Sequence, residues 1–300
     1  MRITKVGTSF GVSPKKVFIQ IHPGNDLLPL NLTQGKPSLS DYRQSLLLHP
    51  ITIYEPENLD EVKKLPEIDC VDFQHSTEIL AQKLVNMSDD AFNEIIIKRR
   101  NNTAKNFVIS SDIEVSELLN CMIKILPEMG SMVERKQNEG HAFDVLKHSL
   151  KVLQKLNQSP EFEHLSSSDK KVINYCALFH DITKKEGISD PLHPLTGCQQ
   201  AIILGKKLGL TETEYNKLYK MVKYHKLLGD YDRNNVEKSL KTLAYDLRED
   251  NLYEMARMFR MADLKGRRAD DSEYIRKGEP FMRFEDAKIR AYRDKINAKK

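Results

Sequence analysis

Apolar residues recur at helical spacing through most of the second half of the chain. Within 141–156, for example, Val145, Leu146, Leu150 and Leu153 fall on one face of a helix. The same spacing predicts further helices over 167–180, from His193 onward, over 211–228 and over 252–263. In the last of these, Asp263 stands where an apolar residue is expected, so its carboxylate needs a cation or hydrogen bonds. The pattern therefore predicts a helical bundle with a charged group turned inward.

Capping residues and loop signals mark where these helices begin. Ser167 or Ser168 is expected to cap the helix that ends at His180, and Thr211 with Glu214 forms a capping box. The pair Asp190-Pro191 indicates a loop that brings His193 to the start of the next helix.

The first part of the chain has a mixed pattern. The runs 17–21 and 51–54 are β-prone, and the stretch between them is rich in Pro, Gly, Asn and Ser. Helical spacing appears over 76–99 and 111–126, the latter with a capping box from Ser111 to Glu114. Polar residues around 127–140 then interrupt the pattern.

These elements predict a mainly α protein. We expect an all-helical domain over 136–270, preceded by a smaller mixed α/β region of unknown role over 1–135. A charged helical extension over 271–300, broken at Pro280, is expected to follow, more as a solvated helix than as a contact for an acidic partner.

Composition narrows the class of protein. The chain is 40% hydrophobic and 30% charged, without tryptophan, and no stretch is long and apolar enough for a signal peptide or a membrane span. We expect a cytoplasmic protein that does not bind a membrane, with secretion without a signal peptide as the alternative. The four cysteines show no CxxC spacing, so neither a zinc knuckle nor a disulfide framework is indicated.

Charge is distributed unevenly along the chain. Residues 1–140 carry 16 Lys/Arg and 19 Asp/Glu, whereas the remainder carries 31 and 24. The histidine-bearing part is therefore the basic part, which suits an anionic nucleotide or nucleic-acid strand. A basic solvated helical surface explains the excess equally well.

A set of histidines and aspartates provides the candidate chemistry. The apolar run 175–179 ends on His180-Asp181, with His148 upstream and His193, His225 and Asp263 downstream. Imidazole and carboxylate donors in this number suit one or two divalent cations beside a phosphate. A single histidine on an apolar face is more often a hydrogen-bonded core residue than a ligand, but the ordered set favours metal binding.

The order and local words of this set resemble the HD superfamily of metal-dependent phosphohydrolases. The words HAFDVLKHSL, ALFHDITK, HPLTG, VKYH and MADL follow one another over about 141–268. They look closest to the HD modules of tRNA CCA-adding enzymes, although residues 1–140 hold no counterpart of the nucleotidyltransferase head. Thr183 stands where many relatives have glycine and no GYP word is evident, so the resemblance does not extend to the cyclic-dinucleotide specificity of HD-GYP proteins.

The resemblance also implies roles for individual residues. His148, His180, Asp181 and Asp263 would hold a first metal, and His193 and His225 would complete a second site that Asp181 bridges, which makes Asp181 a catalytic residue. Lys184 would contact substrate phosphate or protonate the leaving group, the alternative being a solvated lysine. Further substrate contacts are considered at His141, which could instead support a metal ligand, and at Lys265 and Arg267, which could instead be solvated.

The resulting hypothesis is a metal-dependent phosphohydrolase or phosphodiesterase that uses a metal-activated water. Its substrate would be a nucleotide, a cyclic nucleotide or an RNA end, and its cofactor one or two ions of Mn, Fe, Ni, Co or Mg. The alternative is a non-catalytic HD module that binds RNA or a protein partner. A protein partner of the region 1–135 is a separate option, and the sequence leaves the oligomeric state open.

Overall fold

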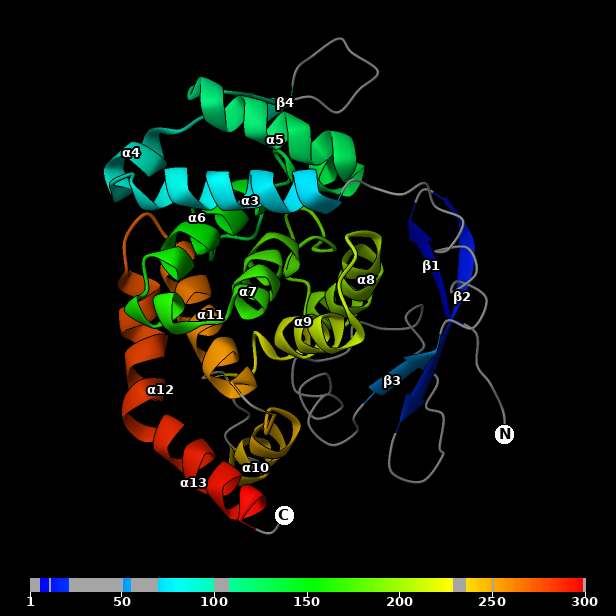
Figure 1. Ribbon diagram of the computed structural model, residues 1–300, viewed down its shortest axis with the longest axis vertical. Helices are drawn as coiled ribbons and strands as arrows, with labels where there is room; N and C mark the ends of the chain where they lie inside the picture. Colours follow the sequence, from blue (N-terminus) through cyan, green and yellow to red (C-terminus); the bar gives the residue numbers. More distant parts are fainter. Residues whose placement is uncertain are drawn as a thin grey trace.

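The computed structural model of the protein describes residues 6–10, 12–21, 51–54, 70–99, 108–228, 236–249 and 251–298. Most of these residues are helical, which confirms the predicted mainly α class (Figure 1). The segment 22–42, predicted to be rich in loops, lies outside the described residues. The longer helices are α3 (Cys70–Val85), α5 (Ile113–Ile125), α6 (Val145–Asn157), α7 (Ser167–Phe179), α8 (His193–Lys207), α9 (Glu212–Tyr224), α10 (Val236–Asp246), α11 (Leu252–Gly266) and α13 (Asp286–Asn297).

Two small antiparallel sheets accompany the helices. Strands β1 (Val6–Phe10), β2 (Val12–Ile21) and β3 (Ile51–Tyr54) form one sheet in that order, so both predicted β-prone runs are strands. Strands β4 (Ile97–Arg99) and β5 (Val108–Ser110) form the other sheet.

The single helix predicted over 76–99 is wrong. Helix α3 ends at Val85, the Ser88 side chain caps a short helix α4 (Asp89–Glu94), and strand β4 follows. The break has two local causes: Ser88 captures the N–H of Ala91, and the β-branched run of three isoleucines ending at Ile97 favours an extended chain.

Two predicted helix starts in this group need correction, and a third is confirmed. Helix α5 is capped by Asp112, which accepts from the Val115 N–H, while the Ser111 hydroxyl accepts from Ile96 N–H in the neighbouring hairpin. Helix α7 is capped by Ser166, one residue before the predicted position, because the Ser166 side chain accepts from the Asp169 N–H. The Thr211 capping box at the start of α9 is confirmed.

Helix α6 begins at Val145, so the helix predicted from His141 starts four residues late. The Asp144 side chain accepts from the Lys147 N–H at 2.8 Å and fixes this start. His141 therefore lies in the preceding loop, and its predicted place two helical turns before His148 on one face is wrong. The loop is tied to α11 by the Ala142 N–H, which donates to the Arg267 carbonyl at 2.8 Å.

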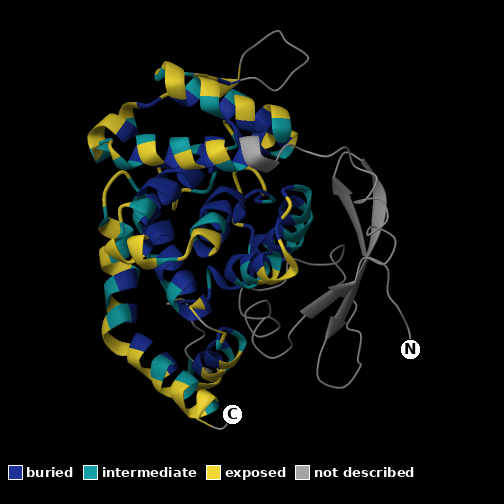
Figure 2. Cartoon of the chain, in the orientation of Figure 1, coloured by how far each residue is buried: buried dark blue, intermediate teal, exposed yellow. Residues whose placement is uncertain are grey.

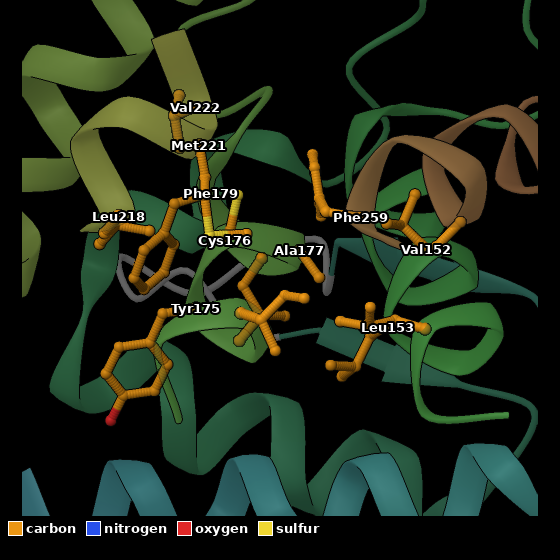
Figure 3. Close-up of a cluster of buried hydrophobic side chains, with 14 of the residues drawn as sticks. Val152, Leu153, Tyr175, Cys176, Ala177, Phe179, Leu218, Met221, Val222 and Phe259 are labelled. Atoms are coloured by element: carbon orange, nitrogen blue, oxygen red, sulfur yellow. The ribbon is translucent and has the colours of Figure 1, made fainter. Parts of the chain in front are cut away.

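Helix α7 lies at the centre of the bundle. Every residue of 172–179 is buried, as expected for a helix that is apolar all round and packed on several sides. It contacts α6, α8, α9 and α11. Figure 3 shows buried side chains from four helices meeting, among them Leu153 of α6, Phe179 of α7, Met221 of α9 and Phe259 of α11. The last turn of α7 thus ends inside the bundle.

The helices before residue 136 share this core. Helix α3 packs against α5 and α6, and its inward residues are buried together with those of the bundle (Figure 2). A polar bond joins the short helix α4 to α6: Lys151 of α6, fully buried, donates to Asp89 at 2.8 Å and lies over the Phe92 ring. The division of the chain near residue 135 stays a prediction.

The C-terminal segment contains the π-helical turn η3 (Tyr274–Gly278), helix α12 (Glu279–Phe284) and helix α13. The break predicted at Pro280 falls instead at Glu285, because a proline in the first turn of α12 lacks an N–H that the helix would not use there. Helix α13 packs against α10, and its Arg290 binds Glu254 of α11 at 2.6 Å. No helix in the described ranges combines the length and apolarity that a membrane crossing requires.

Candidate metal centre

The pair His180-Asp181 lies where the central helix ends. His180 is the C-terminal cap of α7, and its N–H still donates to the Cys176 carbonyl. The chain then turns through an Ile182 N–H bond to the Phe179 carbonyl. Both side chains of the pair are almost completely buried, with 0% and 2% exposed. The apolar character of α7 is what carries these polar groups into the interior.

Four more elements bring the other predicted ligands to the same place. His148 lies in the second turn of α6, His193 is the first residue of α8, His225 caps the end of α9, and Asp263 lies on α11. All four side chains are buried. Phe259, one turn before Asp263, places its ring edge-on against the His180 ring, with the centroids 5.3 Å apart.

The ligand atoms form two main groups, one of His148, His180 and Asp263 and one of Asp181, His193 and His225, and His141 with His148 and Asp181 forms a third. In the first group, His148 Nε2 lies 3.2 Å from His180 Nε2 and 3.2 Å from Asp263 Oδ1. In the second, His193 Nε2 lies 3.2 Å from His225 Nε2 and 3.0 Å from Asp181 Oδ1. Ligands about 2.1 Å from one ion stand roughly 3.0–3.4 Å from each other, so these spacings fit metal coordination.

Asp181 faces both groups with different oxygens. Its Oδ2 lies 3.5 Å from His180 Nε2 and 3.7 Å from His148 Nε2, whereas Oδ1 lies near His193 and, at 3.9 Å, His225. The Oδ1 atom is buried and accepts no hydrogen bond from the described residues. A cation between Oδ1 and the neighbouring imidazole nitrogens would compensate this buried carboxylate oxygen.

Each of the four histidines is oriented by its own Nδ1 atom. Every Nδ1 lies within hydrogen-bond distance of a backbone carbonyl, and a carbonyl can only accept, so the proton of each ring is on Nδ1. The Nε2 lone pairs therefore point into the centre. The carbonyls belong to Gly266 for His148 (3.0 Å), Ala177 for His180 (3.1 Å), Asp190 for His193 (2.5 Å) and Val222 for His225 (2.6 Å).

Burial keeps several of these rings neutral. It lowers the pKa of His180 to about 4, although the Asp181 carboxylate partly offsets the shift. It also lowers the pKa of His193, with Lys226 adding to the effect, and that of His225, with His193 adding to it. Two neutral acceptors 3.2 Å apart repel each other unless a cation lies between them. The donor set thus fits one or two divalent ions, as the buried His/Asp groups indicate.

Two arginines hold Asp263. Its Oδ2 accepts from Arg260 at 2.5 Å and from Arg267 at 3.2 Å, so Oδ1 is left toward His148. Burial opposes ionisation of Asp263, but the charges of Arg267 and Arg260 hold its pKa well below the usual range. Arg260 is fully buried and also donates to the Leu228 carbonyl at 2.9 Å, which ties α11 to the turn after α9.

Lys184 holds the other carboxylate. Its ammonium donates to Asp181 Oδ2 at 3.0 Å and to Gln137 Oε1, and it lies 3.3 Å from His141 Nε2. His141 Nδ1 donates to Asn138 Oδ1 at 3.0 Å, which leaves Nε2 to accept from Lys184. Burial and the Lys184 charge lower the pKa of His141, so its ring is neutral. Lys184 thus has an acceptor for each of its three protons.

The loop after the His180-Asp181 pair is held by hydrogen bonds with Arg135 and Lys136, which lie earlier in the chain. Arg135 donates to the carbonyls of Ile182 at 2.8 Å and Lys184 at 3.1 Å, and the Gly187 N–H donates to the Lys136 carbonyl. These bonds fix the backbone on which Asp181 and Lys184 stand.

The remaining predicted contacts divide into two kinds. Arg267 reaches the centre through Asp263, as described above. Lys265 does not: its ammonium lies over the Tyr274 ring, 4.6 Å from the centroid. Sequence reasoning missed Arg260 and Gln137. Arg260 gave a usable signal, because it is a charge within the apolar stripe of α11 at a three-residue spacing from Asp263.

The roles assigned to individual site residues stay predictions, because proximity alone does not establish them. Comparison with known proteins adds no assignment: no family model matches the sequence, and no curated protein is significantly similar to it.

Proposed function

We propose that the chain is a metal-dependent phosphohydrolase of the HD type that hydrolyses a phosphoester, with a nucleotide, a cyclic nucleotide or an RNA end as substrate. The observation that supports it most is the convergence of four imidazole Nε2 atoms on the two oxygens of one buried aspartate. Four imidazole lone pairs around a buried carboxylate are unfavourable in a protein interior without a positive charge between them. The arrangement therefore favours a bound cation.

The residues would divide the work as follows. His148, His180 and Asp263 would hold one ion, His193 and His225 the other, and Asp181 would contact both. When bound, two divalent ions supply a nucleophilic water at neutral pH and neutralise charge on the phosphoryl group. The metal would be Mn, Fe, Ni, Co or Mg, all of which accept nitrogen and oxygen donors.

The surrounding protein orients these ligands. The carbonyls bound to the four Nδ1 atoms fix the tautomers, and the Lys184 ammonium fixes the rotation of the Asp181 carboxylate. Buried partners of this kind preserve the geometry when substrate enters.

Substitution of the central pair tests the proposal. His180→Ala and Asp181→Ala should each lower hydrolysis of a generic aryl phosphoester by about 10³-fold or more and reduce bound metal, measured by elemental analysis. His164→Ala and Asp270→Ala are matched controls, because both residues are exposed and neither belongs to a ligand group. Undiminished turnover in the Asp181→Ala variant would contradict the mechanism.

A non-catalytic module is the second candidate. It is supported by the excess of basic residues after residue 140, which suits RNA or another anionic partner. Metal-free, inactive protein that still binds RNA would favour this module over the hydrolase.

A further inference from the structure

Three acceptor atoms from two segments of the chain surround the Lys184 ammonium. They are Asp181 Oδ2 at 3.0 Å, His141 Nε2 at 3.3 Å and Gln137 Oε1. A lysine ammonium donates three hydrogen bonds and accepts none, so each acceptor meets one of its protons. Lys184 is 4% exposed, and these three groups therefore enclose its charge.

Other hydrogen bonds orient the two neutral acceptors. Gln137 Nε2 donates to the backbone carbonyls of residues 143 and 144 at 3.1 and 3.2 Å, which turns Oε1 toward Lys184. His141 Nδ1 donates to Asn138 Oδ1 at 3.0 Å, so the Nε2 lone pair faces the same ammonium. The two acceptors are thus oriented by bonds that do not involve Lys184.

The same donor atoms could bind a divalent cation. Imidazole nitrogen, amide oxygen and carboxylate oxygen are all ordinary metal ligands in proteins. The third ligand group, made by His141, His148 and Asp181, has its ligand atoms within 4.8 Å of one another. The Lys184 ammonium contacts two members of this group, so it lies where an ion of the third group would lie.

The distances at this place fit an ammonium. Lys184 Nζ lies 3.0 and 3.3 Å from its acceptors on Asp181 and His141, as in hydrogen bonds, whereas a metal ion would lie about 2.0–2.2 Å from such atoms. In the two main groups the closest ligand atoms are instead 3.2 Å or 3.0 Å apart, which suits a shared ion. The third group is therefore spaced for a lysine and the main groups for metal.

We infer that Lys184 is a tethered cation, which fills a third cation site made by Asp181, His141 and Gln137 and so excludes a third divalent ion. The inference rests on the proposed function only for the metal ions of the two main groups, and not for hydrolysis. Because a side chain cannot dissociate, Asp181 Oδ2 keeps a positive neighbour at every metal concentration. Only the ions of the main groups can then exchange with solvent.

Removal of the ammonium tests the inference by counting ions. Full-length Lys184→Ala and Lys184→Met are dialysed against excess Mn²⁺, and bound ions per chain are measured by elemental analysis. Both variants lose the charge beside Asp181, but only alanine leaves room for an ion. Lys184→Ala should therefore bind one ion per chain more than Lys184→Met. This ion should bind more weakly than the others, because its ligands must move inward by about 1 Å.

Two further variants identify the ligands and guard against a folding defect. Lys184→Ser is equally small and should also gain one ion relative to Lys184→Met. The double variant His141→Ala/Lys184→Ala should lose the added ion, because the imidazole of the third site is gone.

The outcomes separate this inference from the proposed function. Equal numbers of ions in Lys184→Ala, Lys184→Ser and Lys184→Met would overturn the third site, even if the protein hydrolyses phosphoesters. An added ion that persists in the double variant would overturn the assignment of His141 as its ligand. An added ion in Lys184→Ala, in a protein whose wild type binds no metal, would support the tethered cation and contradict the metal-dependent hydrolase.

Discussion

The two halves of the candidate centre hold their carboxylates in different ways. Asp263, which faces His148, accepts hydrogen bonds on Oδ2 from Arg260 of α11 at 2.5 Å and from Arg267, the C-terminal cap of that helix, at 3.2 Å. Asp181 receives one ammonium on Oδ2, and its Oδ1, which faces His193, accepts no hydrogen bond from the described part of the chain. The carboxylate of the first half is thus held by the protein's own charges, whereas Asp181 Oδ1 in the second half would be compensated by a bound cation.

The ionisation of the two carboxylates follows the same division. Burial disfavours both charges, yet Arg267 lowers the pKa of Asp263 and Lys184 lowers that of Asp181, each to well below the usual range. Each carboxylate therefore contributes stability that is present above an unfolded pKa of about 3.9. That contribution is lost as pH falls through the lower pKa of the folded state.

The largest expected effect is on the stability of the metal-free protein. Asp263→Asn leaves Arg260 and Arg267 buried without their anion and should lower the free energy of unfolding by about 3–5 kcal/mol. Asp181→Asn should cost clearly less, because Lys184 keeps two other acceptors. Denaturant unfolding in the presence of chelator measures both, and equal losses would remove the distinction between the halves.

Metal removal should act mainly on the second half. A chelator should lower the free energy of unfolding of the wild type by about 3 kcal/mol if free metal was previously near 100 times its Kd. His193→Ala should show a smaller chelator effect, because it loses a ligand of the half that depends on metal. Thermal unfolding with and without chelator gives this comparison, and an undiminished shift in His193→Ala would argue against metal in that half.

Two glycines at close packing contacts, one in each half, allow a test with a smaller expected loss of stability. A Cβ on Gly266 would lie 2.8 Å from Val152 Cγ2, and one on Gly197 would lie 3.0 Å from the His180 carbonyl oxygen. Overpacking of about 1–3 kcal/mol exceeds the roughly 1 kcal/mol that alanine gains over glycine in a helix, so both substitutions should destabilise.

Their effects on the centre should differ in place. Gly266→Ala should displace Asp263 relative to His148, and Gly197→Ala should displace α8 and therefore His193. Calorimetric Mn²⁺ titration should show weaker binding of a different ion in each variant, with Lys238→Ala, at an exposed position of α10, as the control. Identical titration curves for the two helix variants would contradict separate halves.

The sequence predicted the helical class and the burial of the His180-Asp181 pair because both follow from apolar spacing. The start of α8 at His193 was predictable too, since Asp190-Pro191 marks the loop before it. The apolar spacing gave a wrong prediction for His141, which it placed on α6. Asp144 caps that helix, so the helix begins after His141. The loop instead brings the His141 ring to 5.2 Å from the His148 ring, measured between centroids.

Partners across the fold lay beyond what sequence could predict. Two of the three hydrogen bonds of the Lys184 ammonium depend on Gln137 and His141, which lie in a loop more than forty residues earlier in the chain. The Nδ1 proton of His148 depends likewise on the Gly266 carbonyl of α11. Neither contact leaves a local signal, because each forms only when helices pack.

The distribution of the ligands along the chain has a consequence for how the protein is made. The first of them, His148, is 115 positions before the last, Asp263. During synthesis from the N-terminus, α6 and α7 emerge well before α11. His148 and His180 are therefore present before Asp263, the carboxylate that completes their group. An ion captured by the nascent chain would meet only part of its ligands. Full loading therefore belongs to the last stage of folding, after α11 has docked.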